Sequence, residues 1–298
     1  MHSMPMNQRS LTPFLVASLG IAIFCCMDAL MKGLGLALGA YSALLWRTMV
    51  GVVVTGALWT AGRPSWPTRP LLRLHIGRGL VVAAMAVLWF HAITLVPLAE
   101  AVAISFFAPL LATWLAGLFL HETVSARAVA GSCLGLAGVG AIVAGRLGAP
   151  HGPRIVEGIA AVIASAVLYA GNLVLQRHQA QQAAPQEIAF FQTATVLACL
   201  LPFAAWAEVP ARAQWPLIAG AALFASVSLL LLSWAYARAE AQRLVPTEYT
   251  GFLWLSLLGW WFFGETLTLA TLAGAALIVG GCLLALRQPA AQPQEAML

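Results

Sequence analysis

The chain has 298 residues, of which 61% are hydrophobic and only 8% are Asp, Glu, Lys or Arg, against about 25% charged residues in an ordinary soluble domain. This composition excludes a water-soluble globular protein. The 15 basic residues exceed the 10 acidic ones slightly, but they form no basic run that would bind nucleic acid.

Apolar runs between turn-forming residues predict ten transmembrane helices, because about 20 apolar residues span the core of a bilayer. We therefore expect an all-α integral membrane protein, with no segment long enough for a soluble domain. The polar start of the chain and its long first apolar run predict a retained first helix, not a cleaved signal peptide. The predicted helices cover residues 12–33, 40–60, 76–96, 99–120, 127–145, 155–176, 188–207, 215–237, 243–263 and 267–286.

The distribution of basic residues predicts the orientation, because cytoplasmic loops carry an excess of Lys and Arg. With a cytoplasmic N-terminus, only Arg146, Arg154 and Arg212 lie outside, and Lys32, Arg47 and Arg78 lie in or near the membrane. Both termini are therefore expected in the cytoplasm. The nine cytoplasmic arginines are then Arg9, Arg63, Arg69, Arg73, Arg127, Arg177, Arg238, Arg243 and Arg287.

The two halves of the chain resemble each other at an offset of about 143 residues. Phe119–Ser125 aligns with Phe262–Thr268, and small offsets elsewhere align Asp28 with Asn172. The matches predict two five-helix repeats, residues 12–145 and 155–287. Since five is odd, the second repeat enters the membrane from the opposite side, an arrangement typical of secondary transporters. Further aligned pairs are Lys32 with Gln176, Gly131 with Gly274, and Gly138 with Gly281.

These features resemble the drug/metabolite transporter superfamily, in its EamA-type branch of ten-helix carriers. The resemblance covers residues 11–287 and is most specific at two Glu-Thr turns, His121–Thr123 and Gly264–Thr266. Within the superfamily, Met27–Lys32 and the aromatic-rich third, eighth and ninth helices are most similar to bacterial inner-membrane exporters of aromatic amino acids. The resemblance implies export of aromatic and other hydrophobic amino acids by alternating access. It also implies a central cavity enclosed by helices 1, 3, 4, 6, 8 and 9, with helices 5 and 10 as supports.

The sequence contains no phosphate-binding glycine loop, metal-ligand cluster or nucleophile motif, so we predict neither an enzyme nor a bound cofactor or metal. The expected partners are a small-molecule substrate and the lipid bilayer, and the chain is expected to be a monomer. Two alternatives stay open. One is a carrier of other hydrophobic metabolites or drugs in the same fold, and the other is a membrane-embedded lipid-handling protein.

Ionisable side chains inside the membrane cost about 2.5 to 3.5 kcal/mol each on insertion scales and therefore require a partner or a function. Asp28 and Lys32 are four residues apart and can form a local pair. Alternatively, Asp28 and Asn172 offer acceptors to a substrate ammonium. Arg47 either braces neighbouring helices or binds a carboxylate.

His91 and Glu248 are the other candidates for binding or proton transfer. His91 lies within an aromatic segment and can titrate near neutral pH, although a hydrogen-bonded interior histidine is the commoner case. Glu248 follows a helix-disturbing proline and is a candidate for proton coupling. Glu122 and Glu265 precede helices and are expected to cap them.

Aromatic residues well inside the predicted helices either pack the bundle or line an apolar pocket for the substrate. We select Phe106, Tyr169, Trp234 and Tyr249 as substrate-binding candidates, together with the polar residues Asp28, His91, Asn172 and Glu248. Gly131–Gly135 has the small-residue spacing of closely packed helices and is expected to pack inside the bundle.

Overall fold

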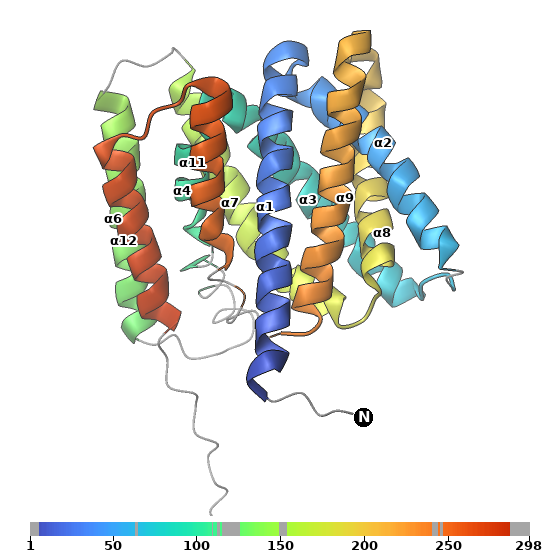
Figure 1. Ribbon diagram of the computed structural model, residues 1–298, viewed down its shortest axis with the longest axis horizontal. Helices are drawn as coiled ribbons and strands as arrows, with labels where there is room; N and C mark the ends of the chain where they lie inside the picture. The colour runs from blue at the N-terminus through green and yellow to red at the C-terminus, as the bar shows by residue number, and fades with distance from the viewer. Residues whose placement is uncertain are drawn as a thin grey trace, which may run out of the picture.

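The computed structural model describes residues 6–62, 65–108, 110–111, 114, 126–148, 154–239, 244 and 247–286. Its regular secondary structure over these residues is helical (Figure 1). The α-helices are α1 (Met6–Leu38), α2 (Ala40–Ala61), α3 (Arg69–Leu95), α4 (Leu98–Ser105), α6 (Ala126–Gly148), α7 (Ile155–Ala180), α8 (Pro185–Leu200), α9 (Trp215–Tyr236), α11 (Thr250–Phe263) and α12 (Leu269–Leu286), with two 3₁₀-helices, η1 (Leu201–Trp206) and η2 (Arg212–Gln214).

The helices confirm the prediction of an all-helical membrane protein. Within the described residues, seven of them are long and apolar enough to cross a bilayer, and α11 and α12 are shorter apolar helices. The predicted fourth helix is described as α4 only in its first part, and the described part of the predicted ninth begins its continuous helix at Thr250.

Among the helix boundaries that differ from the prediction, proline explains two. α3 begins at Arg69 instead of residue 76, because Pro70 occupies the first turn of the helix, where a missing N–H costs nothing. The predicted seventh helix is divided, because Pro202 cannot continue the α-helical hydrogen bonding of α8, and the chain proceeds as the 3₁₀-helix η1.

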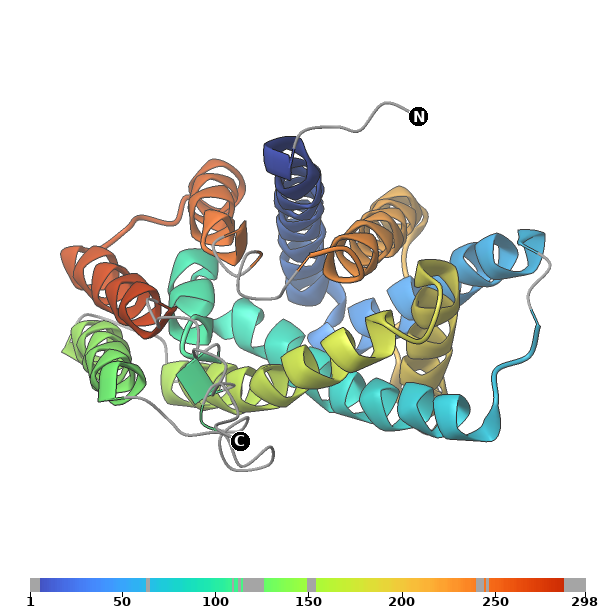
Figure 2. The ribbon, with the colours of Figure 1, turned by 90° about the horizontal axis from the view of Figure 1, so that it is seen from below.

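The helices are arranged in two rows, and a pair of helices lies at each end of the rows. Seen along the bundle in Figure 2, α1, α9 and α11 form one row and α3 and α7 the other. α2 packs against α8 at one end, and α6 packs against α12 at the other. The lower side of the molecule is defined here as the side in Figure 1 on which α1 begins, and the upper side as the one on which it ends.

The contact between α6 and α12 relates the two halves by a two-fold axis. A Cβ atom at Gly138 would lie 2.5 Å from the carbonyl oxygen of Gly274, and one at Gly274 would lie 2.6 Å from that of Gly138. A Cβ at Gly281 would likewise meet the carbonyl oxygen of Gly131. The two helices are therefore antiparallel. Gly131 aligns with Gly274 and Gly138 with Gly281, so replacing each residue by its aligned counterpart converts the Gly131–Gly281 contact into the Gly138–Gly274 contact.

The other helix pairs follow the same two-fold pattern. The first helix of one half packs on the third helix of the other in both cases, α1 on α9 and α7 on α3. The second helices, α2 and α8, pack on each other. These pairings are those of two inverted five-helix repeats.

Candidate functional site

A cavity of about 240 Å³ lies between the two rows of helices. Its walls come from α1, α2, α3, α4, α7, α8, α9 and α11, and none of the described lining residues belongs to α6 or α12. The lining includes Ile21 to Asp28 at the middle of α1. It also includes Tyr236, the last residue of α9, so the cavity extends from the middle of the bundle toward the lower side, where α9 ends.

One wall of the cavity carries Asp28 of α1 and Arg47 of α2. Asp28 is 1% exposed, and its Oδ1 accepts a hydrogen bond of 3.0 Å from the indole N–H of Trp89. The Arg47 guanidinium lies 5.1 Å from the ring centroid of Phe90, in a cation–π geometry, and donates to the sulfur of Met27 at 3.4 Å. The Arg47 side chain therefore contacts both α1 and α3, and it also lines the cavity.

A second buried arginine, Arg78 of α3, lies further toward the lower side. Its Nε donates to Oδ1 of Asn172 at 2.9 Å, and its Nη1 donates to Oε1 of Gln179 at 2.6 Å. Nε2 of Gln179 lies 2.5 Å from Nδ1 of His75, whose Nε2 lies 2.8 Å from Oε1 of Glu187. These hydrogen bonds connect α3, α7 and α8 behind the cavity.

Glu248 brings a second carboxylate to the cavity wall. Both of its oxygens accept hydrogen bonds from tyrosine hydroxyls, from Tyr169 at 2.7 Å and from Tyr236 at 2.9 Å. Tyr169 and Tyr236 also line the cavity. The carboxylate is therefore held by neutral donors and not by a cation in the part of the chain that the structure describes.

Aromatic rings form the apolar surface of the cavity. Trp89 and Phe90 lie on α3, and Phe106 follows α4. The ring of Phe106 contacts that of Tyr249 edge-on at 5.1 Å and lies 6.5 Å from that of Phe252. The cavity thus combines aromatic walls with two cations and two carboxylates.

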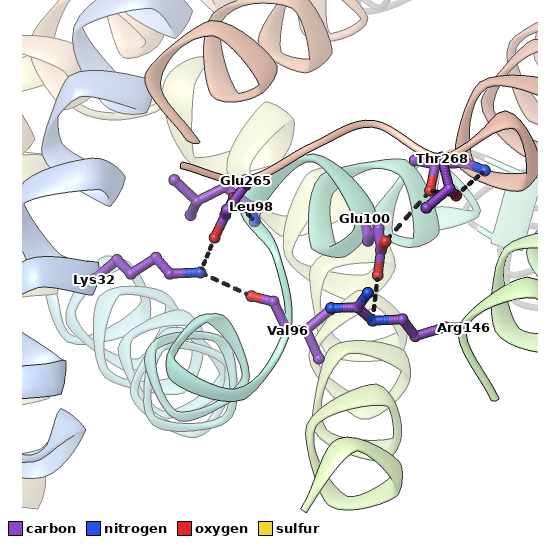
Figure 3. Close-up of polar contacts among 8 residues, drawn as sticks. Lys32, Val96, Leu98, Glu100, Arg146, Glu265 and Thr268 are labelled. Atoms are coloured by element: carbon purple, nitrogen blue, oxygen red, sulfur yellow. Dashed lines mark hydrogen bonds and ion pairs between the residues drawn. The ribbon is translucent and has the colours of Figure 1, made fainter. Parts of the chain in front are cut away.

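Beyond the upper end of the cavity, polar contacts join the two halves of the chain (Figure 3). Lys32, at the upper end of α1, forms an ion pair with Glu265 and donates to the carbonyl oxygen of Val96 at 3.0 Å. Glu265 also accepts from the backbone N–H of Leu98 at 2.8 Å, so it caps the start of α4. α11 ends at Phe263, and the next residue, Gly264, has a φ of 63° that favours glycine and turns the chain toward this contact.

A second ion pair lies beside the first in Figure 3. Glu100 of α4 pairs with Nε of Arg146 of α6 at 3.2 Å and accepts from the Thr271 hydroxyl at 3.4 Å. The backbone N–H of Thr271 is in turn capped by Thr268 at 3.0 Å. The residues of these two ion pairs, Lys32, Glu265, Glu100 and Arg146, are called the upper charge cluster below.

Comparison with known proteins identifies the family. The model of the EamA-like transporter family matches residues 11–144 and, a second time, residues 156–287. The chain belongs to the EamA-like transporter family. The transporter is therefore a multi-pass membrane protein of the drug/metabolite superfamily, a secondary transporter of small metabolites and not an enzyme.

Curated relatives align over most of their length. The transporter is 27% identical to the pseudopaline exporter CntI of Pseudomonas aeruginosa (strain UCBPP-PA14), over 90% of this chain and 94% of the relative. It is 25% identical to the riboflavin transporter of Brucella anthropi, over 82% and 86% of the two chains. A solved crystal structure with 23% identity superimposes with a TM-score of 0.64 over 92% of this chain and 96% of the other. The names of these relatives differ from the aromatic amino acid exporters that the sequence resembles.

The structure brings most of the predicted site residues of the transporter together. Asp28, Phe106, Tyr169, Asn172 and Glu248 line the cavity, and Tyr249 contacts Phe106. The side-chain amide oxygen of Asn172 accepts a hydrogen bond from Arg78.

Three predicted site residues lie outside the cavity lining, namely Tyr249, His91 and Trp234. His91 Nε2 lies 2.7 Å from Oε1 of Glu157 at the upper side, where Glu157 also accepts from Arg154 at 2.7 Å. The hydrogen bond and charge of Glu157 raise the pKa of the Arg154 guanidinium above its usual value. The Trp234 ring faces the Arg238 guanidinium at 4.2 Å at the lower end of α9.

The structure corrects two further expectations. Lys32 does not pair with Asp28, because its long side chain reaches Glu265 and Val96 beyond the cavity while Asp28 bonds to Trp89. Glu265 caps α4 and not the helix that follows it in sequence. Glu122 lies outside the described residues.

Sequence reasoning did not select Arg78, Trp89 or Tyr236 as site residues, although all three line the cavity. A usable signal existed for Arg78, because it is an arginine inside an apolar run without an acidic residue one turn away. Trp89 and Tyr236 carry no such signal. Whether their side chains face the cavity depends on how α3 and α9 are rotated about their axes in the bundle.

Proposed function

We propose that this transporter exports hydrophobic amino acids, aromatic ones above all, across the bacterial inner membrane by alternating access. The observation that carries the proposal is the cavity itself, in which two carboxylates and two guanidinium groups face the same space as aromatic rings. An amino acid zwitterion needs an acceptor for its ammonium, donors for its carboxylate and an apolar surface for its side chain.

The roles within this proposal follow from the contacts. Asp28 and Glu248 supply acidic oxygens to the ammonium, and the rings of Trp89, Phe90 and Phe106 accept an aromatic side chain. Because Lys32 binds Glu265 and Glu100 accepts a hydrogen bond from Thr271, contacts of the upper charge cluster join the two halves and close the upper side in this conformation. Opening it would release the cargo on that side.

The topology belongs to the same proposal. Residues 12–145 and 155–287 are the two five-helix repeats, and both termini lie in the cytoplasm. The exposed Arg69, Arg73 and Arg238 then lie on the cytoplasmic side and support this orientation. The lower side of Figure 1 is the cytoplasmic side.

A second cargo class, other hydrophobic metabolites, is favoured by the names of the relatives, since one exports pseudopaline and another transports riboflavin. The aromatic rings that line the cavity suit a flat ring system as well as an amino acid side chain. The two candidates differ in whether the cargo must carry both an ammonium and a carboxylate.

The test is flux of labelled phenylalanine and tryptophan through purified protein in liposomes, against empty liposomes. We expect saturable flux that unlabelled aromatic amino acids inhibit. Phe106→Ala should raise the KM for tryptophan about tenfold, equivalent to about 1.4 kcal/mol, whereas Trp261→Ala, whose ring is 71% exposed on the outside of α11, should not change it. Absence of flux from folded protein, together with flux of riboflavin-like compounds, would replace the first cargo class by the second.

A further inference from the structure

Arg78 differs from the other buried or half-buried cations of the transporter in its partners. Lys32 and Arg146 each pair with a glutamate, and Arg47 interacts electrostatically with Asp28 and rests on Phe90. Arg78 is 2% exposed, yet its hydrogen bonds go to two neutral amides, and no described carboxylate lies within 4.0 Å of it.

The neighbours of Arg78 are themselves held by a defined chain of hydrogen bonds. Because Oε1 of Gln179 accepts from Arg78, its Nε2 donates to Nδ1 of His75. Nδ1 of His75 is then an acceptor, so Nε2 carries the proton and donates to Glu187. The ring of His75 also stacks on that of Phe191, with 4.9 Å between the ring centroids, and this contact fixes the orientation of the imidazole. Arg78 is thus presented to the cavity by a rigid set of side chains from α3, α7 and α8.

A buried cation without a counter-charge is costly, and an arriving anion removes that cost. Arg78 uses two of its five N–H groups in the described contacts, which leaves donors in a planar fork that matches the two oxygens of a carboxylate. Glu248 lines the same cavity, and its described hydrogen-bond partners are the hydroxyls of two tyrosines. The cavity therefore presents one cation and one carboxylate that are not paired with each other or with other described charges.

We infer that Arg78 is the binding site for the carboxylate group of the cargo, and that the cargo class consists of molecules that carry a carboxylate beside an apolar or aromatic group. This inference rests on the proposed function for the amino acid part of the cargo, because Glu248 would then receive the ammonium. The carboxylate site itself also applies to a carboxylic acid without an amino group.

The first experiment uses the wild-type transporter and a matched series of indole compounds as inhibitors of labelled tryptophan flux in liposomes. Tryptophan, tryptophan methyl ester and tryptamine share the ring but differ in the carboxylate, and indole-3-propionate keeps the carboxylate without the ammonium. We expect the ester and tryptamine to inhibit at least about tenfold more weakly than tryptophan, because each leaves Arg78 without its anion. Equal inhibition by tryptophan and its methyl ester would overturn the inference without any variant.

The second experiment changes Arg78. In Arg78→Gln the preference for tryptophan over tryptamine should fall to within about threefold, and Arg78→Lys should retain part of it, since a lysine supplies the charge without the planar fork. The matched control Arg212→Gln removes an exposed arginine of η2 and should keep the wild-type preference. An unchanged preference in folded Arg78→Gln would overturn the inference.

Thermal stabilisation of the protein by a bound ligand tests the carboxylate site independently of amino acid transport. If tryptophan is not transported, the melting temperature of the detergent-purified protein is measured with indole-3-propionate and with tryptamine. Stabilisation by the acid in the wild type but not in Arg78→Gln would support the carboxylate site while the amino acid proposal fails. Stabilisation by neither compound, or by the acid in both proteins, would overturn the carboxylate site.

Discussion

At the scale of single residues, the ion pair between Lys32 and Glu265 shows how a buried charge is accommodated far from the residue that sequence spacing suggests. The two side chains are 6% and 14% exposed and come from opposite halves of the chain. Breaking a buried pair by removing one partner leaves an uncompensated charge and is more costly than removing both.

A double-mutant cycle on this pair measures that difference. We expect Lys32→Met and Glu265→Gln each to lower the free energy of unfolding in detergent by about 3 to 5 kcal/mol, and the double variant to lower it by much less than the sum. The control cycle is Arg154→Gln with Glu157→Gln, an exposed pair on the same side of the molecule, which should show no measurable coupling because solvent screens it. Additive effects of the Lys32 and Glu265 substitutions would contradict the prediction.

At the scale of elements, the contact between α6 and α12 depends on glycine because the two backbones touch. A Cβ at Gly138 would meet the carbonyl oxygen of Gly274 at 2.5 Å, and backbone atoms in the middle of a helix cannot move aside. We expect Gly138→Ala to lower the free energy of unfolding by about 1 to 3 kcal/mol, the usual cost of overpacking.

Gly140 provides the matched control for Gly138, because it lies in the same helix and a Cβ there meets nothing within 4 Å. Gly140→Ala should be neutral or stabilise the protein by up to about 1 kcal/mol, since alanine is the better helix former. Thermal unfolding of both variants in the same detergent checks the prediction. Equal stability of the two variants would show that α6 and α12 do not pack as closely as described.

The sequence predicts the helices well because length and hydropathy alone decide what crosses a bilayer. The start of α3 and the end of α8 differ from the prediction because the effect of a proline depends on its position within a helix. Pro70 lies in the first turn of α3, whereas Pro202 interrupts the α-helical hydrogen bonding after α8. An apolar run shows that a segment is helical, but it does not show which of its turns are α and which are 3₁₀.

The candidate site is only partly predictable. Intramembrane polar residues such as Asp28 and Glu248 are sound candidates because lipid contact would be too costly for them, and the structure places both at the cavity. His91 lies outside the lining because Glu157, from the other half of the chain, binds it at the upper side. Such a partner depends on how the repeats pack, which a single sequence does not reveal.

At the scale of the whole molecule, the inverted repeats explain how one chain can offer its cavity to either side. The helix pairs α1–α9 and α3–α7 correspond under the two-fold relation. If each repeat adopted the conformation that the other has now, the cavity would face the opposite side of the membrane. The described conformation joins the repeats at the upper side through the Lys32–Glu265 pair. The same relation predicts a second conformation in which contacts between the repeats close the lower side.

The inverted topology and its orientation can be tested together at two corresponding positions. Thr68 immediately precedes α3, Ala213 lies just before α9, and both are exposed. In a background with all five cysteines replaced by serine, Ala213→Cys should react with a membrane-impermeant maleimide in intact cells, because it lies on the outer side. Thr68→Cys should react only after permeabilisation. The reverse pattern would keep the inverted repeats but place both termini outside, and labelling of both positions from the same side would contradict the inversion itself.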